Sequence, residues 1–154
     1  MGKKPGNLIR KGRGDKLTLI RILNFQSKFY MKLLIIEDEV DLAKVLEEKF
    51  VNEGFQVVKI AHDGMEATSL IKSFRPDIIL LDLLLPKKDG FQILEELKDD
   101  PELKHIPVIV LSNLGEDEEI KRALSLGAKD YYVKVQHPIK EIVEKVKAYA
   151  MRGK

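Results

Sequence analysis

Short apolar runs alternate with amphipathic stretches along most of this 154-residue chain, and this alternation narrows the folds open to it. Each run is four to six residues long, and the most apolar of them, such as 32–36 and 78–81, fit strands that are buried on both faces of a sheet. Strands that alternate with helices form βαβ units, whose right-handed crossovers place helices on both faces of a parallel sheet. We therefore predict an α/β fold, a doubly wound parallel sheet with five strands, at 32–36, 55–60, 77–81, 107–111 and 130–133.

The intervening stretches predict five helices, because apolar residues recur in each of them at helical spacing. Asp63 is placed to cap the second helix, and Asp41 and Asp89 also fit helix starts and turns. The apolar stripes of the first and fourth helices include Val45 and Leu124, so we expect these two side chains to face the core. The helices are expected at 40–53, between Asp63 and Pro76, at 91–98, around 120–124 and from Pro138 onward.

Polar residues follow four of the five predicted strands. In the stretch IILLDLLLPKKDG, residues 78–90, four apolar residues lead directly into Asp82. Asp82 would therefore lie at the carboxyl end of its strand, where open α/β sheets place their ligand crevice. Glu37 and Asp38 follow the first strand, Ser112 the fourth and Lys134 the fifth, so we expect all of these side chains to line one crevice.

Three carboxylates that converge in a crevice repel one another unless a cation lies among them or some stay protonated. Oxygen ligands without His or Cys suit Mg²⁺, a hard cation that keeps several waters. An arriving phosphoryl group would be held between the ion and Lys134, with the Ser112 hydroxyl donating to one of its oxygens. Carboxylates can form aspartyl phosphates, a reaction that requires mainly positioning and charge neutralisation. Spacing alone leaves open which of the three carboxylates attacks.

Four motifs in order, LLIIEDE, IILLDLLLPKKDG, VIVLS and GAKDYYVK, carry a resemblance to a known family. Over residues 31–151, about four-fifths of the chain, the sequence resembles the receiver domain of two-component response regulators, the CheY-like fold. The resemblance implies a flavodoxin-like three-layer sandwich with strand order 2-1-3-4-5. It also implies a phosphoacceptor switch rather than an enzyme. Because no output domain follows the last helix, we expect a single-domain response regulator.

The resemblance assigns a role to each residue of the expected crevice. Asp82 would be the phosphoacceptor and would receive its phosphoryl group from a sensor histidine kinase or a phosphotransfer protein. Asp38 and Asp82 would bind Mg²⁺ directly, and Glu37 would bind it through water. The backbone carbonyl of Leu84 would complete the protein ligands.

The same resemblance implies a switch that carries the signal away from the crevice. Ser112 would follow the phosphoryl group inward, and Lys134 would contact it. Tyr131 would turn inward to fill the space that Ser112 vacates, although the neighbouring Tyr132 competes for this role. The surface that binds a downstream protein would be the fourth helix, fifth strand and fifth helix, residues 117–150, and phosphorylation could also drive homodimer formation.

Three positions depart from the usual pattern of the family. Val135 follows Lys134 where the family usually has a proline with a cis peptide bond. A cis bond to another residue costs roughly 2.5–4 kcal/mol, so this bond is either trans or strained. Asn113 follows Ser112 where a small residue is usual, and Leu85 replaces a common methionine of similar volume.

The first thirty residues differ in charge from the rest of the chain. Residues 1–30 hold eight Lys or Arg and one Asp, whereas residues 31–154 hold nineteen basic and twenty-four acidic residues. We expect a disordered basic extension, with a nucleic-acid-binding arm as the alternative, since Lys and Arg neutralise phosphates whatever the base sequence. The chain has no cysteine and no run long enough to span a membrane, so we expect a soluble cytoplasmic protein.

Two other functions remain open from the sequence. A pseudo-receiver, with the fold but without phosphorylation, is suggested by Val135 and Asn113. A phosphatase that forms an aspartyl phosphate generally needs a second carboxylate two residues beyond its nucleophile. Position 84 is a leucine, which argues against the phosphatase.

Overall fold

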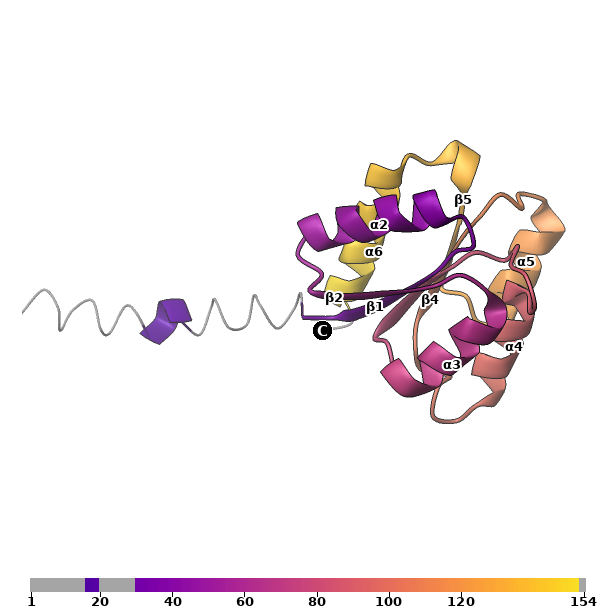
Figure 1. Ribbon diagram of the computed structural model, residues 1–154, viewed down its shortest axis with the longest axis horizontal. Coiled ribbons are helices and arrows are strands. Elements are labelled where there is room, and N and C mark those ends of the chain that lie inside the picture. The colour runs from indigo at the N-terminus through magenta and orange to yellow at the C-terminus, as the bar shows by residue number, and fades with distance from the viewer. Residues whose placement is uncertain (1–15, 20–29, 153–154) are drawn as a thin grey trace, which may run out of the picture.

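The computed structural model describes residues 16–19 and 30–152, and within them residues 31–152 form a three-layer α/β sandwich (Figure 1). Its middle layer is a parallel sheet with strand order β2-β1-β3-β4-β5, which confirms the predicted fold and strand order. The strands are β1 (Lys32–Ile36), β2 (Val57–Ala61), β3 (Ile78–Leu81), β4 (Val108–Ser112) and β5 (Asp130–Val133). The expected basic extension, residues 1–30, lies almost entirely outside the described residues.

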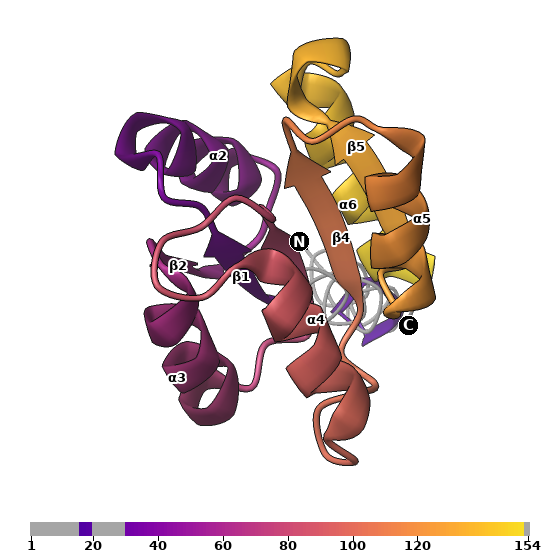
Figure 2. The same ribbon diagram turned by 90° about the vertical axis from the view of Figure 1, so that its right-hand side faces the viewer.

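Helices cover both faces of the sheet, as the crossover rule predicts (Figure 1). On one face lie α2 (Val40–Asn52) and α6 (Ile139–Arg152), the latter preceded by the short 3₁₀ helix η1 (Lys134–Gln136). The other face carries α3 (Gly64–Phe74), α4 (Gly90–Asp99) and α5 (Asp117–Ser125), with α3 and α4 next to each other (Figure 2).

Each face of the sheet has its own apolar core, because successive strand residues point to opposite faces. Along β1, Leu33 and Ile35 pack beneath α2 and α6, whereas Leu34 and Ile36 pack against the α3–α5 side. All four residues of β3 are buried. β3 is therefore apolar throughout, and the first polar residue after it is Asp82, where the functional side chains begin.

Local capping fixes the helices whose starts flank the crevice. Asp63 accepts a hydrogen bond from the Glu66 backbone N–H (2.8 Å) at the start of α3, as predicted. Asp89 caps α4 and forms a reciprocal capping box with Gln92. Asp41 lies in the first turn of α2 rather than at its cap, which is Glu39.

Two predicted core residues face solvent instead. Val45 of α2 is 40% exposed and Leu124 of α5 is 44% exposed. In both helices a neighbour one position away, Leu46 or Ala123, is fully buried. Adjacent helical residues differ by about 100° in direction, so a narrow buried stripe cannot hold both. The prediction that Val45 and Leu124 face the core was wrong.

Candidate functional site

Strand register brings the polar residues after the strands to one edge of the sheet. Ile36 of β1 pairs with Leu81 of β3, so Glu37 and Asp82 each follow one member of a cross-strand pair. The Asp82 backbone N–H donates to the carbonyl of Ile36 (2.9 Å), which extends the ladder to the acidic residue itself. The hydrogen-bonded pairing of β1 and β3 therefore fixes the acidic side chains that follow these strands as neighbours.

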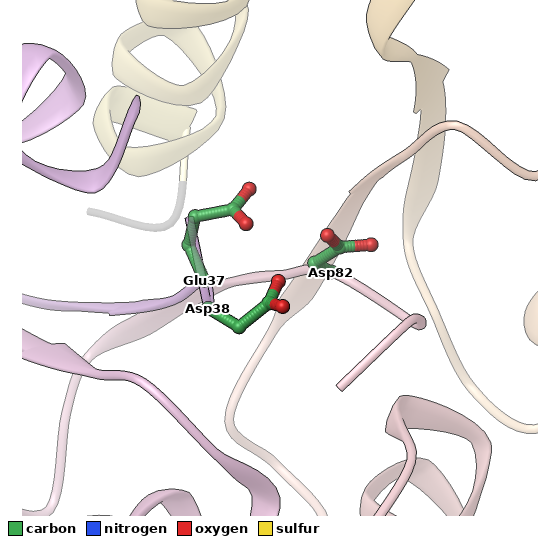
Figure 3. Close-up of side chains that lie close together, drawn as sticks. All are labelled: Glu37, Asp38 and Asp82. Carbon is green, nitrogen blue, oxygen red and sulfur yellow. The ribbon is translucent and has the colours of Figure 1, made fainter. Parts of the chain in front are cut away.

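Three carboxylates form a cluster at this edge. Glu37, Asp38 and Asp82 each offer an oxygen, and these oxygens lie within 4.8 Å of one another (Figure 3). Glu37 is 2% exposed and Asp82 is 4% exposed, whereas Asp38 faces solvent. The cluster therefore has a buried floor and one exposed carboxylate at its opening.

Lys134 reaches this cluster from the end of β5. Its Nζ lies 2.6 Å from Glu37 Oε1 and 2.8 Å from Asp82 Oδ2. The remaining oxygens of these two carboxylates accept backbone hydrogen bonds, Glu37 Oε2 from Glu39 (3.0 Å) and Asp82 Oδ1 from Leu84 (3.1 Å). Both buried carboxylates are thus held in one orientation by a side-chain cation and a backbone donor.

The pKa values of Glu37 and Lys134 are both raised above their usual values. Burial raises the pKa of Glu37 to about 7, against the hydrogen bonds from Lys134 and Glu39 that lower it. Burial alone would lower the pKa of Lys134, but its hydrogen bonds to Asp82 and Glu37 outweigh this and raise the pKa above its usual value. The cluster thus holds three carboxylates and one ammonium, which contacts two of them, and the excess negative charge favours an additional cation. The oxygen donors suit a hard divalent ion, so the residues present fit Mg²⁺.

Ser112 and Tyr131 lie beside the loop that leaves β4. Ser112 is fully buried, and its Oγ accepts a hydrogen bond from the Leu114 backbone N–H (3.4 Å). The Tyr131 hydroxyl donates to the carbonyl of Leu114 (2.5 Å). Burial, followed by the charges of Glu119 and Asp82, raises the pKa of Tyr131 to about 12. Tyr131 is therefore tied to the same loop as Ser112.

Tyr132, the neighbouring tyrosine, points to the opposite face of the sheet. It packs in the core beneath α2 and α6, and its hydroxyl donates to Asp130 Oδ2 (2.7 Å). Consecutive strand residues alternate between faces, so only one of the two tyrosines can neighbour the Ser112 loop. That residue is Tyr131.

The departures from the usual family pattern leave the geometry of Lys134 intact. No peptide bond within the described residues is cis, so the Lys134–Val135 bond is trans. Val135 is 82% exposed, and Asn113 also faces solvent. Lys134 reaches both buried carboxylates from the start of the short turn η1.

Some residues that shape the site were not identified from the sequence. Gly90 packs so closely that an added Cβ would lie 2.7 Å from the carbonyl oxygen of Asp82. His62 Nδ1 lies 3.0 Å from the backbone carbonyl of Glu37. Lys88, part of a run of charges, is not solvated but crosses from the loop after Asp82 to α3 and α4. The glycine that follows Asp89 is the only signal in the sequence for any of these contacts.

Comparison with known proteins identifies the class of protein. The chain matches the family described as response regulator receiver domain over residues 33–147, and it belongs to that family. Receiver domains are phosphoacceptor switches rather than catalytic enzymes, and they interact with histidine kinases and other signalling proteins. An acidic triad such as Glu37, Asp38 and Asp82 is typical of their metal site.

Particular relatives include full-length regulators. The chain is 36% identical over 132 residues to the probable transcriptional regulator ycf27 of Guillardia theta, which covers 86% of this chain and 50% of that protein. It is also 36% identical over 121 residues to the phosphate regulon transcriptional regulatory protein PhoB of Escherichia coli, covering 79% and 52% of the two chains. The chain thus spans about half the length of the curated relatives it matches.

Two solved structures resemble the fold closely. The phosphorylated cyanobacterial phytochrome response regulator RcpA is 34% identical, with a TM-score of 0.68 over 78% of this chain and 91% of that chain. CheY of Borrelia burgdorferi, in its complex with CheX, BeF3 and magnesium, is 32% identical, with a TM-score of 0.70 over 77% and 88%.

None of the helices in the described part of the chain has the length and apolar character that a membrane crossing requires.

Proposed function

We propose that this chain is a phosphorylation switch in which Asp82 accepts a phosphoryl group from a histidine kinase or a phosphotransfer protein. The observation that carries the proposal is the contact of Lys134 with Asp82, at 2.8 Å, inside the cluster of three carboxylates. Membership of the receiver family supports the choice of Asp82 among the three. When bound, Mg²⁺ would be held by Asp38, Asp82, the Leu84 carbonyl and, through water, Glu37, and it would neutralise charge on the phosphoryl oxygens.

The chain's own residues would bring the acceptor and its charge partners into position. A carboxylate oxygen of Asp82 attacks phosphorus, the P–N bond to the donor imidazole breaks, and the leaving imidazole carries away the electron pair. The ammonium of Lys134, held by Glu37 at 2.6 Å, is already placed to pair with an oxygen of the new phosphoryl group. The backbone N–H of Leu84 fixes Asp82 Oδ1 at 3.1 Å and so limits rotation of the acceptor.

The new charge would then alter the contacts around Ser112 and Tyr131. Ser112 donates to the phosphoryl group and releases its contact with the Leu114 loop, which is the loop that Tyr131 also holds. Tyr131 turns inward, and the surface formed by residues 117–150 changes shape to bind a downstream protein. This is a local change of charge that shifts a two-state element.

Chemical-shift mapping with and without the phosphoryl mimic fluoroberyllate, in millimolar Mg²⁺, tests this function. We expect amide shifts near Glu37, Asp82 and Lys134 together with shifts across residues 117–150. The Asp82→Asn variant serves as the control and should show neither set. Shifts confined to the crevice would refute the switch, and their complete absence in the wild type would refute the acceptor.

A pseudo-receiver that binds partners without phosphorylation is the second candidate, favoured by Val135 and Asn113. A titration with Mg²⁺ alone separates the two candidates. A phosphorylation switch binds the ion at millimolar concentration, whereas a pseudo-receiver does not. The Lys134–Val135 peptide bond is trans, and the Lys134 side chain still contacts both buried carboxylates. The replacement of the usual proline by Val135 therefore does not displace the lysine.

A further inference from the structure

The segment that follows Asp82 has few apolar anchors. Leu83 is buried, and its carbonyl accepts a hydrogen bond from Gly90 (2.9 Å), which secures the two ends. Between them, Leu85 is half-buried against the core on the α3–α5 side, whereas Leu84 is 51% exposed and Pro86 and Lys87 also face solvent. Side-chain burial therefore fixes the middle of the segment at Leu85 alone, and this middle contains the carbonyl that we propose as a metal ligand.

A closed ring of polar contacts holds that middle part against α3. The Gly64 backbone N–H donates to the carbonyl of Pro86 (3.1 Å), and the Gly64 carbonyl accepts from the Thr68 hydroxyl (3.1 Å). The Thr68 oxygen in turn accepts a hydrogen bond from Lys88 Nζ (2.9 Å). The chain from Lys88 back to Pro86 closes the ring, so the loop and the first turn of α3 constrain each other.

Lys88 also ties the ring to α4. Its Nζ lies 2.8 Å from Glu96 Oε1 and 3.1 Å from Glu96 Oε2, and its side chain is only 16% exposed. The lysine lines an open pocket of about 200 Å³ between α3 and α4, which lie side by side (Figure 2). A carboxylate and a hydroxyl thus pair with the ammonium, leaving it little freedom to move.

The backbone of Lys88 packs closely against Gly64, so the loop and the start of α3 are fixed relative to each other. A Cβ at Gly64 would lie 1.9 Å from the carbonyl oxygen of Lys88, so the loop rests directly on the helix start. Lys87, the residue between Pro86 and Lys88, has a φ of 69°. A non-glycine residue with positive φ persists only when its surroundings hold it there, and the ring of contacts provides that restraint.

From these contacts we infer that Lys88 is a positioning residue for the phosphoacceptor segment, acting through Pro86 and Gly64 on the Leu84 carbonyl. This inference rests on the proposed function, because it concerns the same metal site. Lys88 contacts neither the ion nor the phosphoryl group. Lys88 restricts the segment to few conformations before Mg²⁺ binds, so less conformational freedom is lost on binding.

The test is the Lys88→Met variant of the full chain, which keeps most of the length of the side chain and removes the ammonium. We expect Mg²⁺ to bind about fivefold or more weakly in a titration followed by NMR, a change within the usual range of coupling between sites. In the Mg²⁺-free protein, the Gly64 amide should exchange its hydrogen faster, because its acceptor on Pro86 is no longer fixed. Lys88→Arg should restore much of both properties.

Two control variants separate positioning from charge and from general stability. Lys87 pairs with Asp63 at 3.3 Å through a side chain that is 65% exposed, so Lys87→Met removes the same charge without opening the ring. Ile142 is buried in the core beneath α2 and α6, on the other face of the sheet from Lys88. Ile142→Val therefore lowers general stability without touching the ring. Both controls should bind Mg²⁺ as the wild type does.

Wild-type Mg²⁺ affinity in Lys88→Met would overturn the inference and leave the proposed function in place. Equal weakening in Lys87→Met or Ile142→Val would overturn it as well, because the effect would then come from charge or stability. A wild-type protein that fails to bind Mg²⁺ would refute the proposed function, and the positioning role with it.

Discussion

Lys134 Nζ and Asp82 Oδ2 lie 2.8 Å apart although the two residues are 52 positions apart in the chain. The contact joins the last strand of the sheet to the central strand β3, and it places the ammonium on the carboxylate that we propose to be phosphorylated. The same ammonium lies 2.6 Å from Glu37. Lys134 therefore stabilises the unphosphorylated cluster and is the charge partner available to an incoming phosphoryl group.

Removal of this lysine should destabilise the protein, because Glu37 and Asp82 would stay buried without a counter-charge. For Lys134→Met in Mg²⁺-free buffer at pH 8 we expect a loss of about 3 kcal/mol in the free energy of unfolding, measured by urea denaturation. The loss should be smaller at pH 5.5, where protonation of Glu37 relieves its repulsion with Asp82. Lys87→Met, at an exposed ion pair, should change stability by less than about 0.5 kcal/mol. Equal losses in the two variants would contradict the role of Lys134.

The raised pKa of Glu37 predicts how stability depends on pH. Its value is about 7 in the folded protein against an ordinary value of 4.5, so the folded state binds this proton more tightly than the unfolded state does. The stabilisation is complete below about pH 4.5 and is lost as pH rises through 7. Without Mg²⁺, the wild type should therefore lose stability relative to Glu37→Gln between about pH 5 and 7. Urea midpoints across this range measure the difference, and parallel curves would contradict it.

Gly90 should not tolerate a side chain. An added Cβ would lie 2.7 Å from the Asp82 carbonyl oxygen and 2.7 Å from Leu83 Cα, both of which are backbone atoms. We expect Gly90→Ala to cost about 2 kcal/mol, since the start of α4 must move away from the acceptor segment. At Gly115 the nearest atom, in Val133, is 3.4 Å from the added Cβ, so Gly115→Ala should stay within about 0.5 kcal/mol of the wild type. Thermal unfolding of the two variants decides the matter, and a similar melting temperature for both would rule out the close contact.

Asp89 should act as a helix cap and not as a phosphoacceptor. Its carboxylate accepts a hydrogen bond from the Gln92 backbone N–H (3.0 Å), and an asparagine side chain can accept the same bond. We therefore expect Asp89→Ala to lose about 1 kcal/mol of stability in urea denaturation and Asp89→Asn to lose almost none. If asparagine proved as destabilising as alanine, the negative charge rather than the hydrogen bond would be the important property.

The sequence was sufficient for the fold because the strands are short and regularly spaced, and the central strand β3 is apolar on both faces. It also identified the side chains that meet at the strand ends, since register in a parallel sheet brings those ends together; their functional roles remain predictions. Finer directions were not recoverable: Val45 and Leu124 lie about 100° from fully buried neighbours, and local pattern does not distinguish these positions. Lys88 was missed for another reason. Its partners Thr68 and Glu96 lie on two helices, and only tertiary packing brings them together.

Phosphorylation of Asp82 can be measured directly by incubating the full chain with Mg²⁺ and a small phosphodonor and counting phosphoryl groups by mass spectrometry. The wild type and Asp89→Asn should each gain one phosphoryl group that is stable in acid and removed by base. Asp82→Asn should gain none, and omission of Mg²⁺ should abolish labelling in every variant. Equal labelling of Asp82→Asn and Asp89→Asn would contradict Asp82 as the acceptor.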